Sequence, residues 1–333
     1  MLWNLSNSTD YAAGIALLAD RDGREIWLTV VKATFDIDAD GQATPAQEQL
    51  PLVYAPLFAG DPVRSSLLAE SDIDYAKPVV DVLVQGTVGP ARPGDARPRL
   101  VVLEVEGRSK ALRVHGQRAW RRTVTGVAAA ACGPFTPMPL DYEHAFGGFD
   151  PGDGGQWDER NPAGCGFARR RADVLDQPAP RIEYAQRPLD EAPPEPAGLG
   201  PVARHWMPRR RHAGTYDAAW TEQRLPLLPL DFDEHFFACA PEDQQFARLS
   251  PQAAIRVSGM GADGELATRL PRIALGLNVH SANGRQHRRP ALRTVLVLPD
   301  TRKIVLTFAD AIECTGWKFG IRDVEVIEKE FIQ

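Results

Sequence analysis

Histidine and cysteine are the residue types most able to bind a metal ion, and the chain places several of them in its middle third. They are His144, Cys165, His205, His212, His235 and Cys239. A protein zinc site usually shows such residues at short, regular spacing, as in H-E-x-x-H or paired C-x-x-C motifs. No pair here has that spacing. We therefore expect no metal site and no cofactor, and interpret these histidines as ordinary loop or core residues.

Acidic residues in the same region raise the possibility of a glycosidase. Such an enzyme needs two carboxylates that face each other across a cleft, and aromatic side chains that stack on sugars. The candidates among the aromatic residues are Asp141, Glu143, Asp231 and Asp233. Asp-x-Phe-Asp motifs also cap turns and pair with arginines, and the sequence favours that structural role. A carbohydrate-active hydrolase remains the alternative.

A nucleophile with an adjacent base has little support in the sequence. The chain contains no G-x-S-x-G motif, and Cys239 lies near His235 only along the sequence. A catalytic cysteine would need the base beside it in space. The glycine pairs Gly147-Gly148 and Gly154-Gly155 lack the G-x-x-x-x-G-K pattern of a phosphate-binding loop. We therefore predict no catalytic residues and a protein that is not an enzyme.

Two long stretches must position any functional group in this region: residues 138–150 with their continuation 161–167, and residues 206–245. They are rich in Gly, Pro, aromatic and acidic residues and show no helical or strand periodicity. Their large apolar side chains are too many to leave in water, so we expect ordered loops with tight turns at the glycines. The residues that we expect to hold these loops in place are Phe146, Gly147, Gly148, Asn161, Pro162, Gly164, Asp217, Asp231 and Asp233.

The same loops could form a recognition surface. Trp, Tyr and Arg dominate the energetics of protein interfaces. On that basis the candidate partner-binding residues are Trp206, Arg209, Tyr216 and Trp220.

The N-terminal third reads as antiparallel β-structure. A strand over 11–18 and a second over 25–38 flank a turn at 20–23, which predicts a hairpin. In the second strand, apolar residues alternate with Lys32, Thr34 and Asp36, a pattern typical of a half-buried strand. Asp61-Pro62 then has the chemistry of a helix start.

Further hairpins and strands follow along the chain. Hairpins are predicted over 99–114, 253–270 and 292–308, and single strands over 78–88, 117–125 (with Trp120 on its buried face) and 322–331. A helix start is indicated at 240–243. The Pro- and acid-rich segment 178–201 is the best candidate for an exposed connector.

These elements predict a mainly β, β-rich α+β fold. We expect antiparallel sheets arranged as a sandwich or barrel, with long ordered Gly/Pro/aromatic loops and few short helices. The chain divides into an N-terminal β region (1–130), a loop-rich central region (131–243) and a C-terminal β region (244–333) that can form one continuous domain with the first.

Composition narrows the class of protein. The net charge is −6 at pH 7, whereas nucleic-acid binders usually carry an excess of basic residues. The charge therefore argues against a nucleic-acid binder. The two arginine triplets, 169–171 and 209–211, are interpreted as solvated loop charge, with a patch for an anion or an acidic partner as the alternative. No apolar run could span a bilayer and the N-terminus lacks a signal-peptide core, so we expect a cytoplasmic protein without a membrane partner.

The four scattered cysteines are expected to be buried free thiols.

An ordered series of motifs resembles one bacterial family. The series begins with Lys32-Ala-Thr-Phe35, Glu70-Ser-Asp72, Lys77-Pro78, Asp81-Val82, Gly116-Gln-Arg118, Trp120, Met138-Pro-Leu140, Ala145-Phe-Gly-Gly148, Asn161-Pro162 and Gly164-Cys-Gly-Phe167. It continues with Gly200-Pro201, Trp206-Met-Pro-Arg209, Ala213-Gly-Thr-Tyr-Asp217, Trp220, Pro229-Leu-Asp-Phe-Asp233 and Ala240-Pro-Glu-Asp-Gln-Gln245. Together, over residues 7–308, they resemble the bacterial "domain of unknown function 2169" proteins.

The resemblance implies a function. Proteins of that family are associated with the bacterial type VI secretion system and look like cytoplasmic chaperones or adaptors. They are expected to bind a secreted effector toxin and help it reach the spike tip, beside a valine-glycine-repeat or PAAR protein. The family carries no established catalytic residues, so none are transferred. A structural component of the secretion machine is the remaining alternative, beside the hydrolase.

Overall fold

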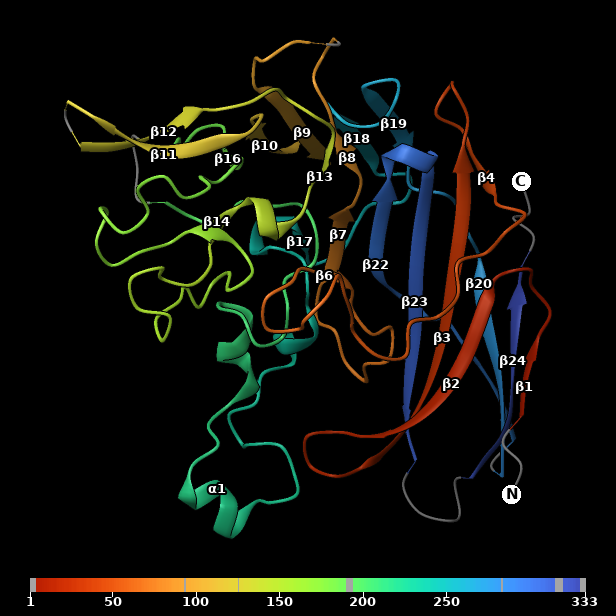
Figure 1. Cartoon of the computed structure of the whole chain (residues 1–333). Helices are drawn as coiled ribbons and strands as arrows, with labels where there is room; N and C mark the ends of the chain where they lie inside the picture. The colour runs from red at the N-terminus through yellow and green to blue at the C-terminus, as the bar shows by residue number, and fades with distance from the viewer. Residues whose placement is uncertain are drawn as a thin grey trace.

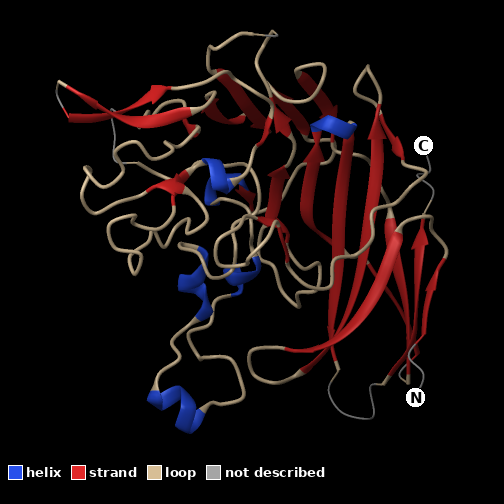
Figure 2. Ribbon diagram, viewed as in Figure 1, coloured by secondary structure: helices blue, strands red, loops and turns tan. Residues whose placement is uncertain are grey.

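The computed structural model describes residues 4–92, 94–124, 126–189, 194–282, 284–314 and 320–329. These residues form mostly antiparallel sheets joined by loops and short helical segments (Figure 2). Within the described ranges one of those helical segments is an α-helix, and the others are 3₁₀ turns. The predicted mainly β fold class is therefore confirmed. The end of the strand predicted over 322–331 lies outside the described residues.

The largest sheet joins strands from both ends of the chain (Figure 1). Its order is β17-β7-β22-β23-β3-β2, with β4 beside β3. Only β7 and β22 run parallel. The strands are β2 (Ala12–Ala19), β3 (Glu25–Ile37), β4 (Ala43–Pro45), β7 (Val80–Val84), β17 (Gln245–Phe246), β22 (Ala291–Leu298) and β23 (Lys303–Glu313).

Two further sheets pack beside it. A five-stranded sheet has the order β16-β10-β9-β18-β19, and a four-stranded sheet has the order β1-β24-β20-β21. The strands of the first are β9 (Arg99–Val105), β10 (Arg108–Val114), β16 (Ile182–Tyr184), β18 (Ala254–Ser258) and β19 (Glu265–Arg269). Those of the second are β1 (Asn4–Asn7), β20 (Leu275–Ser281), β21 (Gly284–Arg288) and β24 (Ile321–Glu328).

Short elements make up the rest. The two-stranded pairs are β5 (Leu57–Phe58) with β6 (Leu67–Ala69), β8 (Thr87–Val88) with β13 (Met138–Pro139), β11 (Arg118–Thr123) with β12 (Gly126–Ala131), and β14 (Phe146–Gly147) with β15 (Cys165–Gly166). The helix is α1 (Ala218–Gln223), and the 3₁₀ turns are η1 (Tyr142–His144), η2 (Arg209–Ala213), η3 (Glu234–Phe237), η4 (Glu242–Gln244) and η5 (Pro299–Thr301).

One hydrophobic core unites the three large sheets. It contains Val31 and Phe35 of the largest sheet, Leu103 of the five-stranded sheet, and Leu277 and Val326 of the four-stranded sheet. Burial of these apolar side chains is the main favourable contribution to folding. The loop region adds Tyr142, Trp206 and Leu199 to the same core, so the loops are packed parts of the fold.

Strand β3 is buried on both faces, so the prediction of a half-buried strand is wrong. The face opposite the main core carries Leu28 and Val30, on which Leu52 and Ile73 pack. Lys32 on that face is also buried, and its Nζ lies 2.8 Å from Asp72. The segment before β7 folds over this face, which turns an alternating pattern into a strand with two covered sides.

All four predicted hairpins are confirmed, but several other local predictions are wrong. The helix start predicted at 240–243 gives only the 3₁₀ turn η4. Asp61-Pro62 starts no helix: Asp61 accepts a hydrogen bond from the Val63 amide (2.8 Å), and the chain makes a single turn. The described parts of segment 178–201 are not an exposed connector, since they contain β16 and the Val84 amide donates to the buried Leu199 carbonyl (3.0 Å); residues 190–193 lie outside the described residues. All four cysteines are free thiols, but the expectation that they are buried is correct only for Cys239, since Cys132 is exposed and Cys165 and Cys314 are partly exposed.

A glutamine side chain completes the backbone pairing of β3. Between the segments of β3 that pair with β2 and β4, the Thr34 amide donates to Gln49 Oε1 (2.7 Å), and Gln49 Nε2 donates back to the Thr34 carbonyl (3.0 Å). The Ala46 amide also donates to that carbonyl. The Thr34 N–H therefore depends on Gln49 for its partner.

We predict that Gln49→Leu lowers the free energy of unfolding by about 1–3 kcal/mol, because the Thr34 N–H loses its acceptor. Urea denaturation measures the change. The matched control is Gln47→Leu, two residues earlier at an exposed position, which should change stability by less than about 0.5 kcal/mol. Equal effects at the two positions would contradict the pairing role of Gln49.

Candidate functional site

An arm of residues 214–231 extends from the loop region between η2 and η3, with α1 near its tip (Figure 1). Asp217 starts α1, because its side chain accepts a hydrogen bond from the Trp220 amide (2.8 Å). Trp220 then packs edge-on against Tyr216, with ring centroids 4.7 Å apart, and its Nε1 donates to the Leu227 carbonyl (2.9 Å). The arm is therefore internally ordered.

The arm also rests on the turn between β2 and β3. Arg224 pairs with Asp22 at 2.6 Å and donates to the Arg21 carbonyl at 2.9 Å. A Cβ built on Gly23 would touch Leu227, so the two segments are in close contact. These contacts fix the direction in which the arm projects.

Large apolar side chains of the arm remain in solvent. Tyr216 is 53% exposed, Leu225 57% and Leu230 73%. Exposed apolar groups gathered on one projecting element are typical of a contact surface for another protein. Of the four predicted partner-binding residues, Tyr216 and Trp220 lie in this arm.

Trp206 and Arg209 are buried, which corrects the expectation that they contact a partner at the surface. Trp206 is fully buried and packs edge-on against Tyr142, with ring centroids 5.5 Å apart. The guanidinium of Arg209 donates to the carbonyls of Phe236 (2.7 Å) and Val202 (2.8 Å) and pairs with Glu70. It cross-links three segments of chain and cannot reach solvent without local unfolding.

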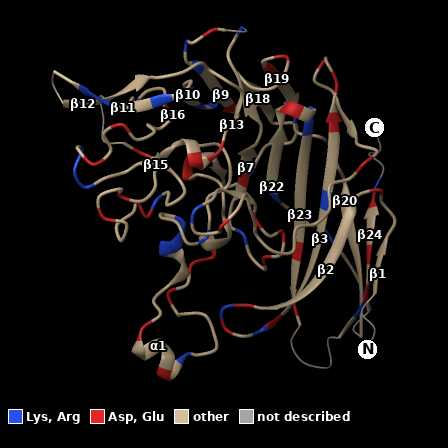
Figure 3. Cartoon of the chain, viewed as in Figure 1, with Lys and Arg blue, Asp and Glu red and all other residues tan. Residues whose placement is uncertain are grey.

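The Arg209–Arg211 triplet is correspondingly not uniform. It forms the basic segment of η2 in Figure 3, where charges of both signs are otherwise spread over the loops. Arg210 pairs with Glu159 and Arg211 with Glu242 at the surface, whereas Arg209 is internal. The interpretation of the whole triplet as solvated charge is thus wrong for its first member.

The first loop stretch is held together by contacts among its turn residues, centred on Asn161. The buried Asn161 side-chain amide donates to the carbonyls of Tyr142 (2.8 Å) and Phe146 (3.0 Å), and the backbone carbonyl of Asn161 accepts from the Gly148 amide (2.8 Å). Gly148 has φ +89°, and a Cβ there would lie 2.2 Å from the Gly164 carbonyl oxygen. Phe146, Gly147 and Pro162 pack at the same junction.

The acidic residues that a glycosidase would use already have protein partners. Asp141 accepts from His144 Nδ1 (2.6 Å), and Glu143 accepts from the Ser66 amide (3.1 Å). Asp231 accepts from both the amide and the hydroxyl of Thr215 (3.0 and 2.7 Å). These contacts anchor loops, and they leave the carboxylates engaged in structural hydrogen bonds.

A hollow of about 800 Å³ lies elsewhere, between the β3–β4 turn and strands β9, β10, β18 and β19. The glutamates that line this hollow also have protein partners. Glu104 lies 3.6 Å from Arg256, and Glu106 accepts from the Ser250 amide (2.8 Å). This hollow contains none of the candidate residues from the sequence.

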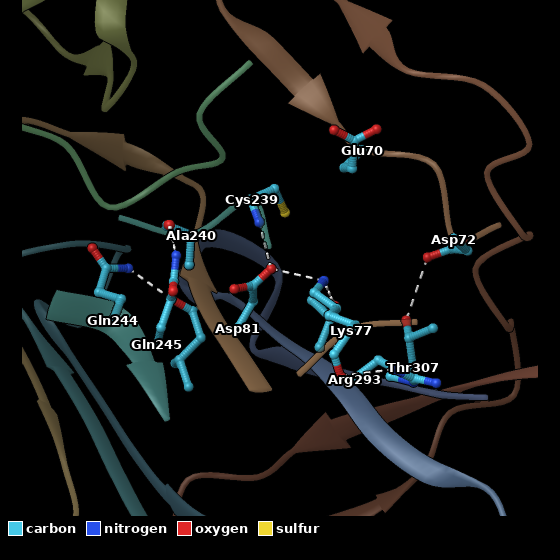
Figure 4. Close-up of polar contacts among 12 residues, drawn as sticks. Glu70, Asp72, Lys77, Asp81, Cys239, Ala240, Gln244, Gln245, Arg293 and Thr307 are labelled. Carbon is cyan, nitrogen blue, oxygen red and sulfur yellow. Dashed lines mark hydrogen bonds and ion pairs between the residues drawn. The ribbon is translucent and has the colours of Figure 1, made fainter. Parts of the chain in front are cut away.

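Cys239 belongs to a buried polar cluster (Figure 4). Its amide donates to Asp81 (2.7 Å), which forms an ion pair with Lys77 (2.7 Å). Burial raises the pKa of the Cys239 thiol well above its ordinary value. The thiol is therefore protonated and enclosed, so it cannot serve as a nucleophile.

Asp74 lies at the edge of the same cluster with one carboxylate oxygen that finds no partner among the described residues. Burial raises the pKa of Asp74 to about 6, although Lys77 and Arg293 act in the opposite direction. Desolvation favours the neutral carboxylic acid. This group therefore stabilises the fold when protonated and destabilises it when charged.

The structure brings together three residues that the sequence analysis left apart. His212 Nδ1 and His235 Nδ1 each lie 2.8 Å from an oxygen of Asp233. The two imidazoles have centroids 5.6 Å apart, and a hollow of about 350 Å³ opens beside them. Burial works to raise the pKa of Asp233, but hydrogen bonds from the His235 amide and both imidazoles outweigh it and lower that pKa to about 2.

Spacing motifs missed this cluster because its members stand at opposite ends of the arm. His212 precedes the arm and Asp233 follows it, and the Asp233 amide donates to the His212 carbonyl (3.0 Å). Only knowledge that the intervening segment returns to its starting point could have paired them.

Comparison with known proteins gives one family. Residues 22–309 match the family model DUF2169, described as an uncharacterized protein conserved in bacteria. No curated protein and no solved structure matches the chain. No helix within the described residues has the length and apolar character needed to cross a membrane.

We predict that Gly148→Ala lowers the free energy of unfolding by about 2 kcal/mol or more, because the positive φ and the Gly164 carbonyl leave no room for a Cβ. Thermal and urea unfolding measure the loss. Gly154→Ala is the control, since a Cβ there meets nothing within 4 Å. A Gly148→Ala protein as stable as the control would overturn the crowding argument.

Asp74→Asn should change how stability depends on pH. The ordinary Asp pKa is about 3.9 and the folded value is about 6. The protonated Asp74 side chain therefore contributes fully to the free energy of unfolding below pH ~4, and that contribution is lost as the pH rises through ~6. The loss lowers the free energy of unfolding by up to about 3 kcal/mol. The side chain at position 74 of the Asp74→Asn variant stays neutral at every pH. The free energy of unfolding of the variant, relative to that of the wild type, should therefore increase from pH 4 to pH 7. The measurement is urea unfolding at each pH, with exposed Asp40→Asn as control. Parallel curves for Asp74→Asn and wild type would contradict the burial effect.

Proposed function

Because the chain belongs to the DUF2169 family of bacterial proteins, we propose that it is a type VI secretion adaptor or chaperone. In this proposal it acts in the cytoplasm, binds a secreted effector toxin and helps to load it onto the spike tip. The tip partner is a valine-glycine-repeat or PAAR protein. The motif resemblance given above supplies the link to this secretion system.

The observation that carries a binding role is the ordered arm with its exposed apolar side chains. Tyr216, Leu225 and Leu230 project from a segment that is fixed by the Asp217 cap and by Arg224 on the β2–β3 turn. A surface that is already ordered loses little conformational freedom when it binds, so more of the contact energy appears as affinity.

An adaptor needs a contact that forms and later breaks. A small exposed apolar surface is suited to a transient complex, whereas obligate interfaces are larger and more hydrophobic. Binding an effector segment in its folded form would stabilise that form by mass action until it is delivered. Release then requires only competition from the spike.

The engaged carboxylates support an adaptor over a carbohydrate-active hydrolase. Asp141, Glu143 and Asp231 accept hydrogen bonds from neighbouring loops, as described above. A hydrolase would instead hold two carboxyl groups about 5 to 10 Å apart in an open groove. A structural component of the machine would be co-secreted at fixed stoichiometry, which distinguishes it from an adaptor that stays in the cell.

The test is an affinity pull-down of the tagged protein from cells that express the secretion system, read by mass spectrometry. We expect recovery of a toxin and a spike-tip protein. The triple variant Tyr216→Ala/Leu225→Ala/Leu230→Ala should reduce that recovery by about tenfold or more, as loss of a central apolar contact does at other interfaces. Its unfolding temperature should change little, since these side chains are exposed.

A matched control comes from three exposed residues outside the arm. Tyr54, Leu57 and Leu100 have similar exposed fractions (63%, 53% and 53%). The triple alanine variant at these positions should capture partners like the wild type. Wild-type recovery by the arm variant would remove the arm from the binding surface. Absence of any secretion partner would argue against the adaptor itself.

A further inference from the structure

His212, Asp233 and His235 have the composition and placement of a metal-binding site. Their ligand atoms, two imidazole nitrogens and a carboxylate oxygen, all lie within 4.8 Å of one another. Each imidazole Nδ1 lies 2.8 Å from a different oxygen of the same carboxylate. Atoms around a tetrahedral Zn²⁺ ion, each about 2.0–2.2 Å from the metal, are spaced over comparable distances.

We propose that these three residues bind a divalent transition-metal ion, with Zn²⁺ as the preferred candidate. Imidazole favours Zn²⁺ and related ions, whereas Mg²⁺ and Ca²⁺ favour oxygen ligands alone. In the metal-free protein each Nδ1–H donates to Asp233. On binding, each neutral ring carries its proton on Nε2, and Nδ1 presents its lone pair to the ion. The Arg211 Nε–H, which donates to His212 Nε2 (3.3 Å) in the metal-free protein, then turns toward solvent.

The protein holds the three ligands in place without a metal. The Asp233 carboxylate accepts a further hydrogen bond from the His235 amide (2.9 Å), which caps η3. The backbone hydrogen bond from Asp233 to His212 joins η3 to the end of η2. Ligands that are positioned in advance reduce the ordering that binding must otherwise bring about.

The site has an open side. The hollow of about 350 Å³ beside the imidazoles is also lined by Glu242 and Arg211, which form an ion pair. His235 and Asp233 are each about half exposed at their side chains. Water can therefore complete the coordination shell, and an ion can enter from solvent. Three protein ligands with an open position is the arrangement of zinc sites that exchange a ligand.

The position of the site gives it a structural consequence that does not depend on the proposed function. His212 precedes the arm, and Asp233 and His235 follow it. A bound ion would link the two ends of the arm and stabilise its base against opening. The metal would thus stiffen the element that carries Tyr216, Leu225 and Leu230.

The experiment is a calorimetric titration of ZnCl₂ into the full chain, with any affinity tag removed and after treatment with a chelator. We expect one Zn²⁺ per chain and a Zn²⁺-dependent rise in unfolding temperature. His212→Ala, His235→Ala and Asp233→Asn should each weaken binding on the order of 100-fold, since even outer-shell changes reach that size. Asn keeps an oxygen that can cap η3. MgCl₂ in place of ZnCl₂ should give no binding.

The matched control is His144→Ala. His144 forms the same Nδ1 hydrogen bond with Asp141 (2.6 Å) but is not part of the three-residue cluster. It should bind Zn²⁺ like the wild type. Circular dichroism checks that each variant is folded. If His212→Ala does not fold, the Zn²⁺ affinity of His235→Ala is the test, because the His235 ring is half exposed and its removal should leave the fold intact. Failure of the wild type to bind Zn²⁺, or unchanged affinity in His235→Ala, overturns the proposal.

Discussion

The antiparallel pairing of β3 with β23 is the constraint on which the rest of the structure depends. Eleven residue pairs, from Asp36 with Lys303 to Ile26 with Glu313, join the two ends of the chain in one continuous register. Both faces of β3 are covered. One face meets the other two sheets, and segment 46–73 covers the opposite face, where the buried Lys32 pairs with Asp72. A buried lysine without that carboxylate would destabilise the sheet strongly.

The loop region is ordered for a similar reason: its apolar side chains are buried and its buried polar groups have partners. Its apolar residues, including Trp206 and Leu199, complete the core beside β7, and its polar residues satisfy one another through short-range contacts. Arg209 illustrates the principle, since a single guanidinium binds two backbone carbonyls and Glu70. Long segments without regular secondary structure stay ordered because their buried backbone groups have partners.

The sequence predicted the local elements well, because hairpins depend on turn chemistry and alternation within a few residues. The turns at 20–23, 261–264 and 299–301 each lie where that chemistry placed them. Burial depends on what folds over an element from elsewhere, and alternation cannot reveal it. For this reason Lys32 and Arg209 were expected in solvent, and segment 178–201 was expected at the surface. The proximity of His212 to Asp233 escaped detection for the same reason, since it depends on the path of the arm.

The arm leaves the body and returns to it at almost one point, where the Asp233 amide meets the His212 carbonyl. Its ends therefore behave like the ends of an insertion. Substitutions, or even changes of length, between them would alter the tip while the sheets and the remaining loops kept their packing. A chain built this way can change the surface of a single short segment while the scaffold stays the same.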